Sequence, residues 1–529
     1  MAKQMHPPGT VGDFYWAYCD ILRGAYGISE SMYDQRVMAF MALKLLVDNA
    51  KVGFNFDYTA NFGQVKYTGS PKEVFTQIVN DLPAFDKSSY LAQPVKLHRK
   101  TTSDELESVL TRFNSPQVFD LSAYVEELSE PHLLLVLDAY REKANFAGYP
   151  PEEYKDLYER TVWRMANSGK KSISGQLTGQ HFTQRAIIKM MCATAWPRIA
   201  KLKSGKRGQP ALAIYDPTCG VGSMLMESYF YFKQKQPNLD IKVYGQELSP
   251  QVWALAKIFL EVADIPNEIA LGNTLTAPAF SSGVNGDSSF DFIIANPPFG
   301  VDWKHDYAAI HEDMLKDEGS SYLVVKDAAD KPLTPRKSDG QLLFIQHILK
   351  LLKTERTARN KSGFAAVVTS GSLISVGTDA SAEAQIRQAI FNSGLLYAVV
   401  EQPQGMFTNT DVATHVWMFQ SGDNGERCRF KLLKADHPAA PMFSTHPAAR
   451  DKMRSTYSDE NIEAIAAEVN NRVDNTPVSI GVSTKNRRRV SFATELPIAS
   501  SERGKSLSIL DAELKEMVRQ LAVMAGVLV

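Results

Sequence analysis

Cysteine is scarce in this sequence. The four cysteines, Cys19, Cys192, Cys219 and Cys428, stand far apart and form no CxxC pair. A structural zinc site requires clustered thiolate or imidazole ligands, and a disulfide framework is typical of short secreted chains rather than one of 529 residues. We therefore expect buried, reduced thiols and no metal site.

Long apolar runs are also missing. No run reaches the roughly 18 residues that a membrane-spanning helix needs, and the N-terminal stretch MAKQMHPPGTVGDFYW contains no apolar signal-peptide core. The sequence therefore predicts a cytoplasmic protein with no membrane contact.

Charge of one sign is not in excess, since the formal net charge is −1. Nucleic-acid binders often carry a basic excess. A nucleic-acid partner would therefore require basic side chains gathered on one face, or a second subunit that supplies much of the phosphate contact. Composition does not choose between these two arrangements.

Two nucleotide-binding signatures are absent. No GxxxxGK[ST] loop occurs, which argues against a nucleotide-driven translocase within this chain. The glycine loop at residues 216–223 lacks the third glycine of the dinucleotide fingerprint, which disfavours an oxidoreductase. Asp511, Glu513 and Lys515 superficially match a nuclease signature, but they occur in a helical pattern and are interpreted as a solvated helix face.

The apolar content, 44% of the residues, suffices for the cores of two or three domains. Residues 13–50 and 103–147 show helical spacing of apolar side chains, and we predict no strand before about residue 205. Beyond Pro210, short apolar runs alternate with predicted helical segments such as 251–262, 341–353 and 383–391. The runs are ALAIY, IKVYG, FDFIIAN, GFAAVVTS, LYAVVEQ and THVWMFQ. This alternation favours a parallel α/β sheet covered on both faces.

Two stretches break the alternation. The polar insertion 301–340 shows little periodicity, and we predict a long functional loop there. After Gln420 the strand pattern stops: residues 421–505 are mixed and partly polar, and a final helix is predicted over 507–521.

The tetrapeptide Asn296-Pro297-Pro298-Phe299 follows the run FDFIIA, where a buried strand ends. Ligands of open α/β sheets bind at the carboxyl ends of strands. The Asn296 side-chain oxygen and the Pro297 carbonyl can each accept one N–H of an exocyclic amine, which would free its conjugated lone pair, and Phe299 can stack on a base. The alternative, an ordinary turn, is disfavoured by its position after this strand and downstream of the next motif.

The stretch DPTCGVGS at residues 216–223 follows the run ALAIY and opens a helix predicted over 223–233. Gly220 and Gly222 let the backbone approach a ligand closely, and an acid such as Asp216 suits a cationic ligand. Glu247 ends the next strand, where an acid can accept both hydroxyls of a ribose. The alternative is a plain strand–helix turn.

Two weaker signals flank this motif. The stretch GQHFTQR at residues 179–185 precedes a predicted helix, for which Thr183 is a plausible N-cap, and it is either a lid over a cofactor or simply a capped helix start. Asn273 follows the third strand, where it can contact an adenine edge or cap the loop.

These motifs, in this order, resemble the modification subunits of Type I restriction-modification systems, which are gamma-order N6-adenine DNA methyltransferases. The resemblance is carried by DPTCGVGSML, YGQELS, LGNTL, FDFIIANPPFG, DGQLLFIQHILKLLK, QGMF with the segment 414–419, and YCDILRG near the N-terminus, and it covers roughly residues 10–425. The chain departs from the family pattern at His181 and Gln184 in the lid, and at Thr218-Cys219 in the glycine loop.

The resemblance implies an α/β fold in three parts. A helical N-terminal domain would occupy residues 1–155. A Rossmann-like methyltransferase domain with a mixed seven-stranded sheet would occupy 156–425, and a partly helical C-terminal tail would occupy 426–529.

The resemblance also implies an adenine-specific, site-specific DNA methyltransferase that moves a methyl group from S-adenosylmethionine to a flipped adenine, without a metal or a covalent enzyme intermediate. The catalytic role would fall on Asn296, Pro297, Pro298 and Phe299. The implied cofactor-binding residues are Gln180, His181, Phe182, Thr183, Arg185, Asp216, Thr218, Gly220, Gly222, Glu247 and Asn273.

The implied partners are double-stranded DNA, a specificity subunit for target recognition, and a translocase-nuclease restriction subunit. The final helix predicted over 507–521 either packs on the specificity subunit or docks on the chain's own core. A related phage-defence complex is the broader setting. Two alternatives stay open. The [DNS]PP[FYW] motif also serves cytosine N4, guanine N2 in RNA and glutamine in protein, and a non-catalytic subunit would retain the same fold.

Overall fold

The computed structural model describes residues 61–62, 65–66, 131–132, 183–202, 211–280, 290–352, 363–374, 376–378, 380–407, 414–421, 429–435, 443–447, 453–471, 475–476 and 479–483. Most of the expected helical N-terminal domain and the expected final helix lie outside these residues. A short hairpin of β1 (Asn61–Phe62) and β2 (Val65–Lys66) corrects the expectation of no strand before residue 205. None of the described helices has both the length and the hydropathy to cross a membrane.

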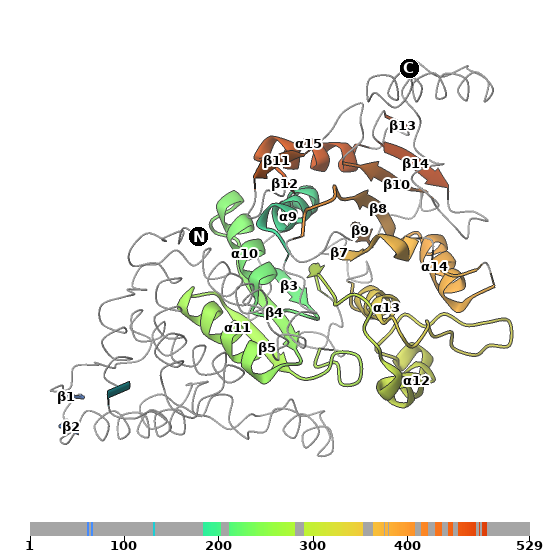
Figure 1. Cartoon of the computed structure of the whole chain (residues 1–529), viewed down its shortest axis with the longest axis horizontal. Coiled ribbons are helices and arrows are strands. Elements are labelled where there is room, and N and C mark those ends of the chain that lie inside the picture. The colour runs from blue at the N-terminus through green and yellow to red at the C-terminus, as the bar shows by residue number, and fades with distance from the viewer. Residues whose placement is uncertain are drawn as a thin grey trace, which may run out of the picture.

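The described part of the chain is organised around one mixed ten-stranded sheet, in the order β13-β14-β10-β8-β9-β7-β6-β3-β4-β5 (Figure 1). Its strands β3 to β8 and β10 run parallel, whereas β9 and β14 are antiparallel to their neighbours. The strands are β3 (Leu212–Asp216), β4 (Ile241–Glu247), β5 (Asn267–Leu271), β6 (Phe292–Ala295), β7 (Phe364–Ser370), β8 (Leu396–Glu401), β9 (Thr414–Gln420), β10 (Arg429–Lys434), β13 (Asn475–Thr476) and β14 (Ser479–Ser483).

Six strands, β3, β4 and β6 to β9, contain the apolar runs that the sequence identified, and they are buried almost throughout. Continuous burial on both faces explains why these strands read as apolar runs rather than as an alternating pattern. The α/β class is therefore confirmed.

The expected strand count is wrong, because the sheet continues past Gln420 through β10 and β14. The sequence pattern did not indicate β10, because the lysines of this strand resemble solvent-facing residues. Lys431 is only 3% exposed, however, and its ammonium donates to the carbonyls of Glu468 (2.9 Å) and Asn471 (2.6 Å). These carbonyls lie at the C-terminal end of α15 (Asp459–Asn470), so the lysine caps a helix that the local sequence does not reveal as its partner.

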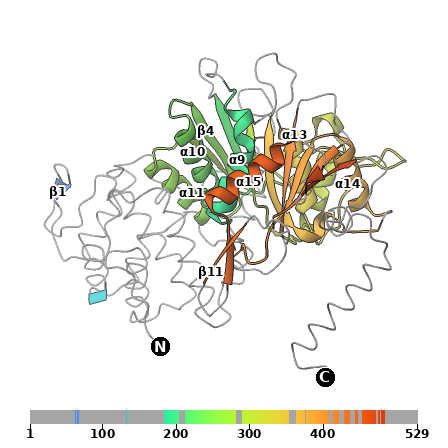
Figure 2. The same cartoon turned by 90° about the horizontal axis from the view of Figure 1, so that it is seen from above.

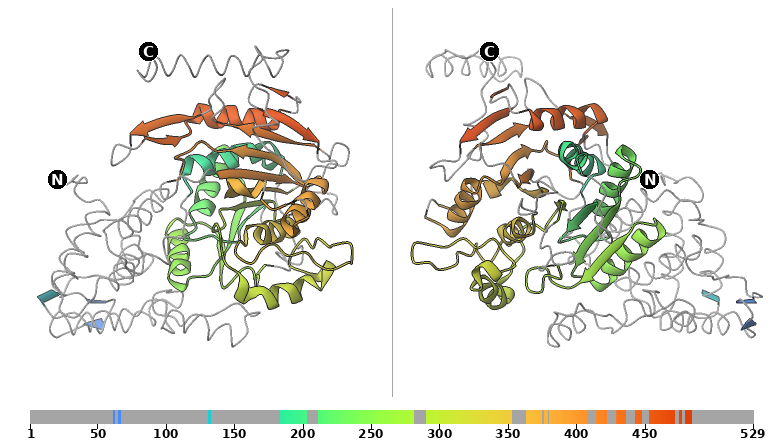
Figure 3. Two further views of the ribbon diagram at one scale, coloured as in Figure 1. Left: turned by 45° about the vertical axis from the view of Figure 1, so that its right-hand side comes forward. Right: turned by 180° about the vertical axis from the view of Figure 1, so that it is seen from behind.

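Helices pack on both faces of the sheet (Figures 1 and 3). The core cluster on one face joins α13 (Gln341–Leu351) and α14 (Ala382–Asn392) to side chains of β3, β6, β7 and β9. The other helices beside the sheet are α9 (Arg185–Ile199), α10 (Ser223–Lys235) and α11 (Pro250–Val262). The helices predicted over 223–233, 251–262, 341–353 and 383–391 are confirmed within two residues at each end.

Helix α15, the last helix along the chain among the described residues, lies alongside α9 (Figure 2). The Arg198 guanidinium in the last turn of α9 donates to the side-chain oxygens of Asn470 (2.7 Å) and Gln420 (2.7 Å), and it stacks 4.3 Å from the centre of the Tyr397 ring. Asn470 donates back to the carbonyl of Thr194 (3.2 Å). Helix α9 is therefore fixed by residues about 200 or more positions later in the chain.

The insertion 301–340 is more ordered than the sequence predicted. It contains α12 (Tyr307–Met314) and a small apolar core of its own, in which Trp303, Ile310 and Met314 are fully buried. The expectation of a long loop is wrong because these apolar side chains form one buried cluster with Leu343 and Phe344 of α13, a tertiary contact that the local sequence does not reveal.

Candidate active site

The glycine loop begins where β3 ends. Asp216, its first residue, is 1% exposed, and its Oδ1 accepts the backbone N–H of Thr218 at 2.9 Å. Gly220 and Gly222 have φ angles of +56° and +80°, which other residues rarely adopt, and Gly222 is the N-cap of α10. A Cβ atom at Gly220 would meet nothing within 4 Å, so the backbone there faces open space.

Glu247, at the end of β4, holds this loop in place. Its Oε2 accepts the N–H of Gly220 at 3.1 Å, and its Oε1 accepts the N–H of Ser249 at 2.8 Å. Strands β3 and β4 are parallel neighbours, so their carboxyl ends bring the loop and the acid to one edge. The sequence predicted that these residues meet, and the structure brings them together.

Burial, together with the nearby Glu247 carboxylate, raises the pKa of Asp216 to about 7 against the opposing hydrogen bonds from Thr218. Burial likewise raises the pKa of Glu247, although the N–H groups of Ser249 and Gly220 lower it in part. Within the residues that the structure describes, no lysine or arginine forms an ion pair with either acid. The edge therefore brings two buried acids together, and neither is ion-paired with a described lysine or arginine.

Cys219, one of the two departures in this loop, packs directly on Gly245 of β4. A Cβ atom at Gly245 would lie 2.8 Å from the Cys219 Sγ and 3.0 Å from the Ile269 Cδ1. The larger residue in the loop is thus accommodated by the absence of a side chain on the neighbouring strand.

We expect Gly245→Ala to lower the free energy of unfolding by about 1–3 kcal/mol, because overpacking at this contact displaces the loop or the strand. Urea denaturation followed by circular dichroism measures the change. Adding Cys219→Ala should recover part of the loss, since it removes the sulfur. Gly319→Ala is the matched control, because its Cβ would lie an ordinary 3.7 Å from the Lys316 Cβ. Equal stabilities for Gly245→Ala and the parent would contradict the packing argument.

The tetrapeptide 296–299 starts directly after β6, which pairs in parallel with β3. It therefore lies at the same sheet edge as the glycine loop, on the adjacent strand. Pro297 is buried, whereas Asn296, Pro298 and Phe299 are partly exposed. The loop after the third strand, β5, is joined to the glycine loop, because the Thr274 hydroxyl donates a hydrogen bond to the Pro217 carbonyl at 2.6 Å.

Asn273 has both ends of its amide engaged within the loops. Its Oδ1 accepts the N–H of Leu275 at 3.0 Å, and its Nδ2 donates to Asp306 Oδ2 at 3.2 Å. Of the two alternatives for Asn273, contact with an adenine edge or capping of the loop, these hydrogen bonds correspond to loop capping. Leu248, directly after Glu247, is a large apolar side chain that is 39% exposed at this edge.

The lid motif is only partly described, because Gln180, His181 and Phe182 lie outside the described residues. Thr183 is not the N-cap of α9: Gln184 takes that position, and the buried Thr183 hydroxyl contacts Met224 Sδ at 3.6 Å instead. Burial against α10 redirects the hydroxyl from the helix end to a tertiary partner. Arg185, the first residue of α9, forms an ion pair with Glu227 of α10 at 2.8 Å. Both contacts fix the end of the motif beside the glycine loop.

The order of these strands and the placement of these motifs agree with a family comparison. The model of the family described as N-6 DNA Methylase matches residues 152–496, and the chain belongs to this family. The predicted family is thereby confirmed.

The chain is 25% identical over 321 residues to the Type I restriction enzyme HindI methylase subunit of Haemophilus influenzae, covering 60% of this chain and 61% of that one. It is 30% identical over 255 residues to the MjaVII methylase subunit of Methanocaldococcus jannaschii, covering 48% and 39% respectively. The matches thus span less than two thirds of the length of each of these relatives. A type I methyltransferase subunit from Streptococcus thermophilus shares the fold, with a TM-score of 0.57, 20% identity, and coverage of 90% and 96%.

Proposed function

We propose that this chain transfers a methyl group from S-adenosylmethionine to the N6 amine of adenine in double-stranded DNA, as the modification subunit of a Type I restriction-modification complex. Its family membership and the names of its relatives support the reaction class. The observation that carries the proposal is the meeting of Asp216, Glu247 and the tetrapeptide 296–299 at the carboxyl edge of adjacent strands.

The residues at this edge fit the cofactor. Two buried carboxylates favour a cationic ligand, and the open space at Gly220 lets its backbone approach one. When bound, S-adenosylmethionine supplies a reactive methyl group on a cationic sulfur. Asp216, Thr218, Gly220, Gly222 and Glu247 would hold it, together with the lid residues at 180–183 and 185 that the family resemblance implies.

The tetrapeptide supplies what an aromatic amine needs in order to react. The lone pair of an exocyclic amine is delocalised into the ring, so the nitrogen is a poor nucleophile. Acceptors at the Asn296 side chain and the Pro297 carbonyl draw its two N–H bonds out of the ring plane and localise the lone pair. Phe299 would stack on the base, which must leave the duplex to reach this edge.

A protonation change should accompany cofactor binding. The pKa of Asp216 is about 7, so a large share of this group is protonated near neutral pH. A cation stabilises the ionised acid and lowers its pKa, so binding should release protons, and affinity should rise from about pH 6 to about pH 8.

Calorimetric titration of the chain with S-adenosylmethionine, in buffers of different ionisation enthalpy, measures this release. Asp216→Asn should abolish the buffer dependence, whereas Asp240→Asn at an exposed position should retain it. Heats that do not depend on the buffer in the parent chain would contradict the assigned role of Asp216.

The substrate is tested by mass spectrometry of nucleosides from DNA incubated with the protein, the specificity subunit and isotopically labelled cofactor. We expect labelled N6-methyl-2′-deoxyadenosine. Labelled N4-methyl-2′-deoxycytidine would overturn the choice of base. Label in RNA or protein would overturn the choice of DNA, and a chain that binds cofactor yet transfers no label in the complete complex would be the non-catalytic alternative.

The partners follow from the same proposal. A specificity subunit would read the DNA sequence and contact the C-terminal region, and a translocase-nuclease restriction subunit would complete the complex. Gel filtration of the chain with and without the specificity subunit tests this arrangement. Site-specific methylation by the chain alone would defeat it.

A further inference from the structure

The segment that follows the tetrapeptide is held by a returning segment, 336–340, at the far end of the insertion. The carbonyl of Val301 accepts the N–H of Gly340 at 3.1 Å. The fully buried Trp303 donates its backbone N–H to the carbonyl of Lys337 (2.9 Å) and its indole N–H to the carbonyl of Arg336 (3.0 Å). Three hydrogen bonds thus fix the chain within a few residues of Phe299.

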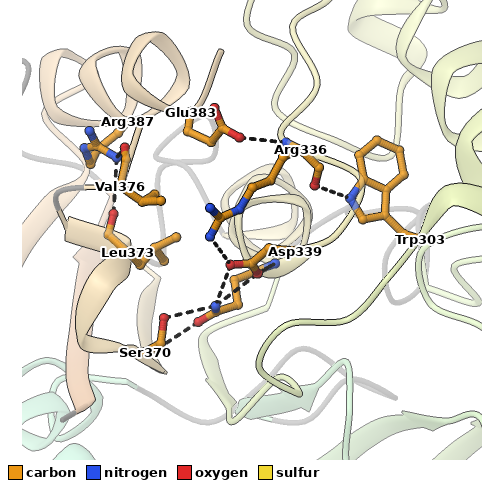
Figure 4. A network of polar contacts seen from close by, with 9 residues as sticks. Trp303, Arg336, Asp339, Ser370, Leu373, Val376, Glu383 and Arg387 are labelled. Carbon is orange, nitrogen blue, oxygen red and sulfur yellow. Dashed lines mark hydrogen bonds and ion pairs between the residues drawn. The ribbon is translucent and has the colours of Figure 1, made fainter. Parts of the chain in front are cut away.

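The returning segment is in turn held by α14, as Figure 4 shows. Glu383, in the first turn of α14, accepts the backbone N–H of Arg336 at 2.8 Å. The helix is itself tied to the chain that leaves β7, because the fully buried Arg387 donates to the carbonyls of Leu373 (3.2 Å) and Val376 (2.9 Å). Glu383 therefore connects a rigid helix to the backbone that supports the indole of Trp303.

A second connection runs through Gln341, which is 3% exposed at the start of α13. Its amide oxygen accepts the N–H of Ser370 at 2.8 Å, and its amide nitrogen donates to Ser370 Oγ (3.1 Å) and to Asp339 Oδ1 (3.0 Å). Asp339 also pairs with the Arg336 guanidinium at 3.2 Å. Ser370 is the last residue of β7, the strand next to β6. The tetrapeptide is thus held from two adjacent strands. Its first residue follows β6 directly, and the chain after its last residue is connected to β7 through this network.

We infer that Glu383 and Gln341 are positioning residues for methyl transfer, which set the place of Asn296–Phe299 through Trp303 and the returning segment. The inference rests on the proposed function. Neither side chain has a hydrogen bond to the glycine loop or Glu247 among those of the described residues. Their loss should therefore move the amine acceptors without changing cofactor affinity. A misplacement of about 1 Å can cost on the order of 100-fold in rate.

The first test compares Glu383→Ala with Glu383→Gln, which keeps a neutral oxygen for the N–H of Arg336. In the complex with the specificity subunit, Glu383→Ala should lower kcat by about 10–100-fold, with the Kd for S-adenosylmethionine unchanged within about twofold. Glu383→Gln should stay within about threefold of the parent kcat. Equal kcat values for Glu383→Ala and the parent, or an equal loss in both variants, would overturn the assignment.

A second variant and a second readout cover the case in which Glu383→Ala folds poorly or the substrate is another amine. Gln341→Glu is nearly isosteric and places a second carboxylate beside Asp339, so its kcat should fall by at least about tenfold. Hydrogen exchange of the isolated chain should show faster exchange at the amides of Trp303 and Gly340 in Glu383→Ala and Gln341→Glu, but not in Glu383→Gln. Unchanged protection at both amides would overturn the inference, whatever base the parent enzyme methylates.

Discussion

Replacing Asn296 with alanine is expected to lower kcat for methyl transfer by roughly 10²–10³-fold, the usual cost of removing one preorganised polar group from a catalytic site. The side chain would supply one of the two acceptors that localise the amine lone pair, and the Pro297 carbonyl would supply the other. Cofactor affinity should stay within about twofold of the parent value, because the glycine loop and Glu247 belong to other strands. Single-turnover transfer of a radiolabelled methyl group in the complete complex measures the rate.

The matched control for this variant is Asn392→Ala. Asn392 is exposed at the end of α14 and accepts a hydrogen bond only from the neighbouring turn of the same helix, at Gln388. It should retain the parent rate. If Asn296→Ala transferred methyl groups as fast as the parent, the tetrapeptide would not be the catalytic site, and the proposed chemistry would be wrong.

The second large effect is expected at Glu247. Glu247→Ala should raise the Kd for S-adenosylmethionine by roughly 10–100-fold, because hydrogen bonds to a charged group contribute about 1.5–3 kcal/mol. Without the carboxylate, the N–H groups of Gly220 and Ser249 lose their shared acceptor, and the glycine loop loses its tie to β4. The acid would also be lost as an acceptor for the ribose hydroxyls. Isothermal titration calorimetry measures the change.

Two further variants make this result specific. Glu247→Gln keeps one acceptor oxygen and removes the charge, so its Kd should lie between those of Glu247→Ala and the parent. Glu268→Ala, on the adjacent edge strand, removes an exposed carboxylate that pairs with Lys242 at 2.9 Å and should leave the Kd unchanged. A parent-like Kd in Glu247→Ala would remove this acid from the cofactor site.

Six strands, β3, β4 and β6 to β9, could be predicted because each contains a short apolar run that is buried on both faces, so the local sequence is sufficient to indicate it. The meeting of the glycine loop, Glu247 and Asn296 followed from the rule that ligand groups gather at the carboxyl ends of parallel strands. That rule needs the alternation of strands and helices, which the sequence displays from Pro210 to Gln420. The same reasoning located the helices that carry Ser223 and Gln341 at their first residue.

The missed features share a different property. Lys431 resembles a surface lysine until α15 places the carbonyls of Glu468 and Asn471 around its ammonium. His347 lies in a helical pattern, yet it is fully buried with Nδ1 at 3.0 Å from the Ser321 carbonyl, and burial lowers its pKa to about 4. In each case the polar group is satisfied by a partner from another element.

The sequence by itself determined which residues are the candidates for the chemistry and at which edge of a sheet they stand, because these depend on local apolar runs and on the turn after each strand. Only the tertiary structure decided how firmly those residues are held: the tie of Glu247 to Gly220, the fit of Cys219 on Gly245, and the network of Gln341 and Glu383 behind Trp303. Such contacts join residues 26 to 47 positions apart. Their formation depends on chain packing in three dimensions, which no local pattern encodes.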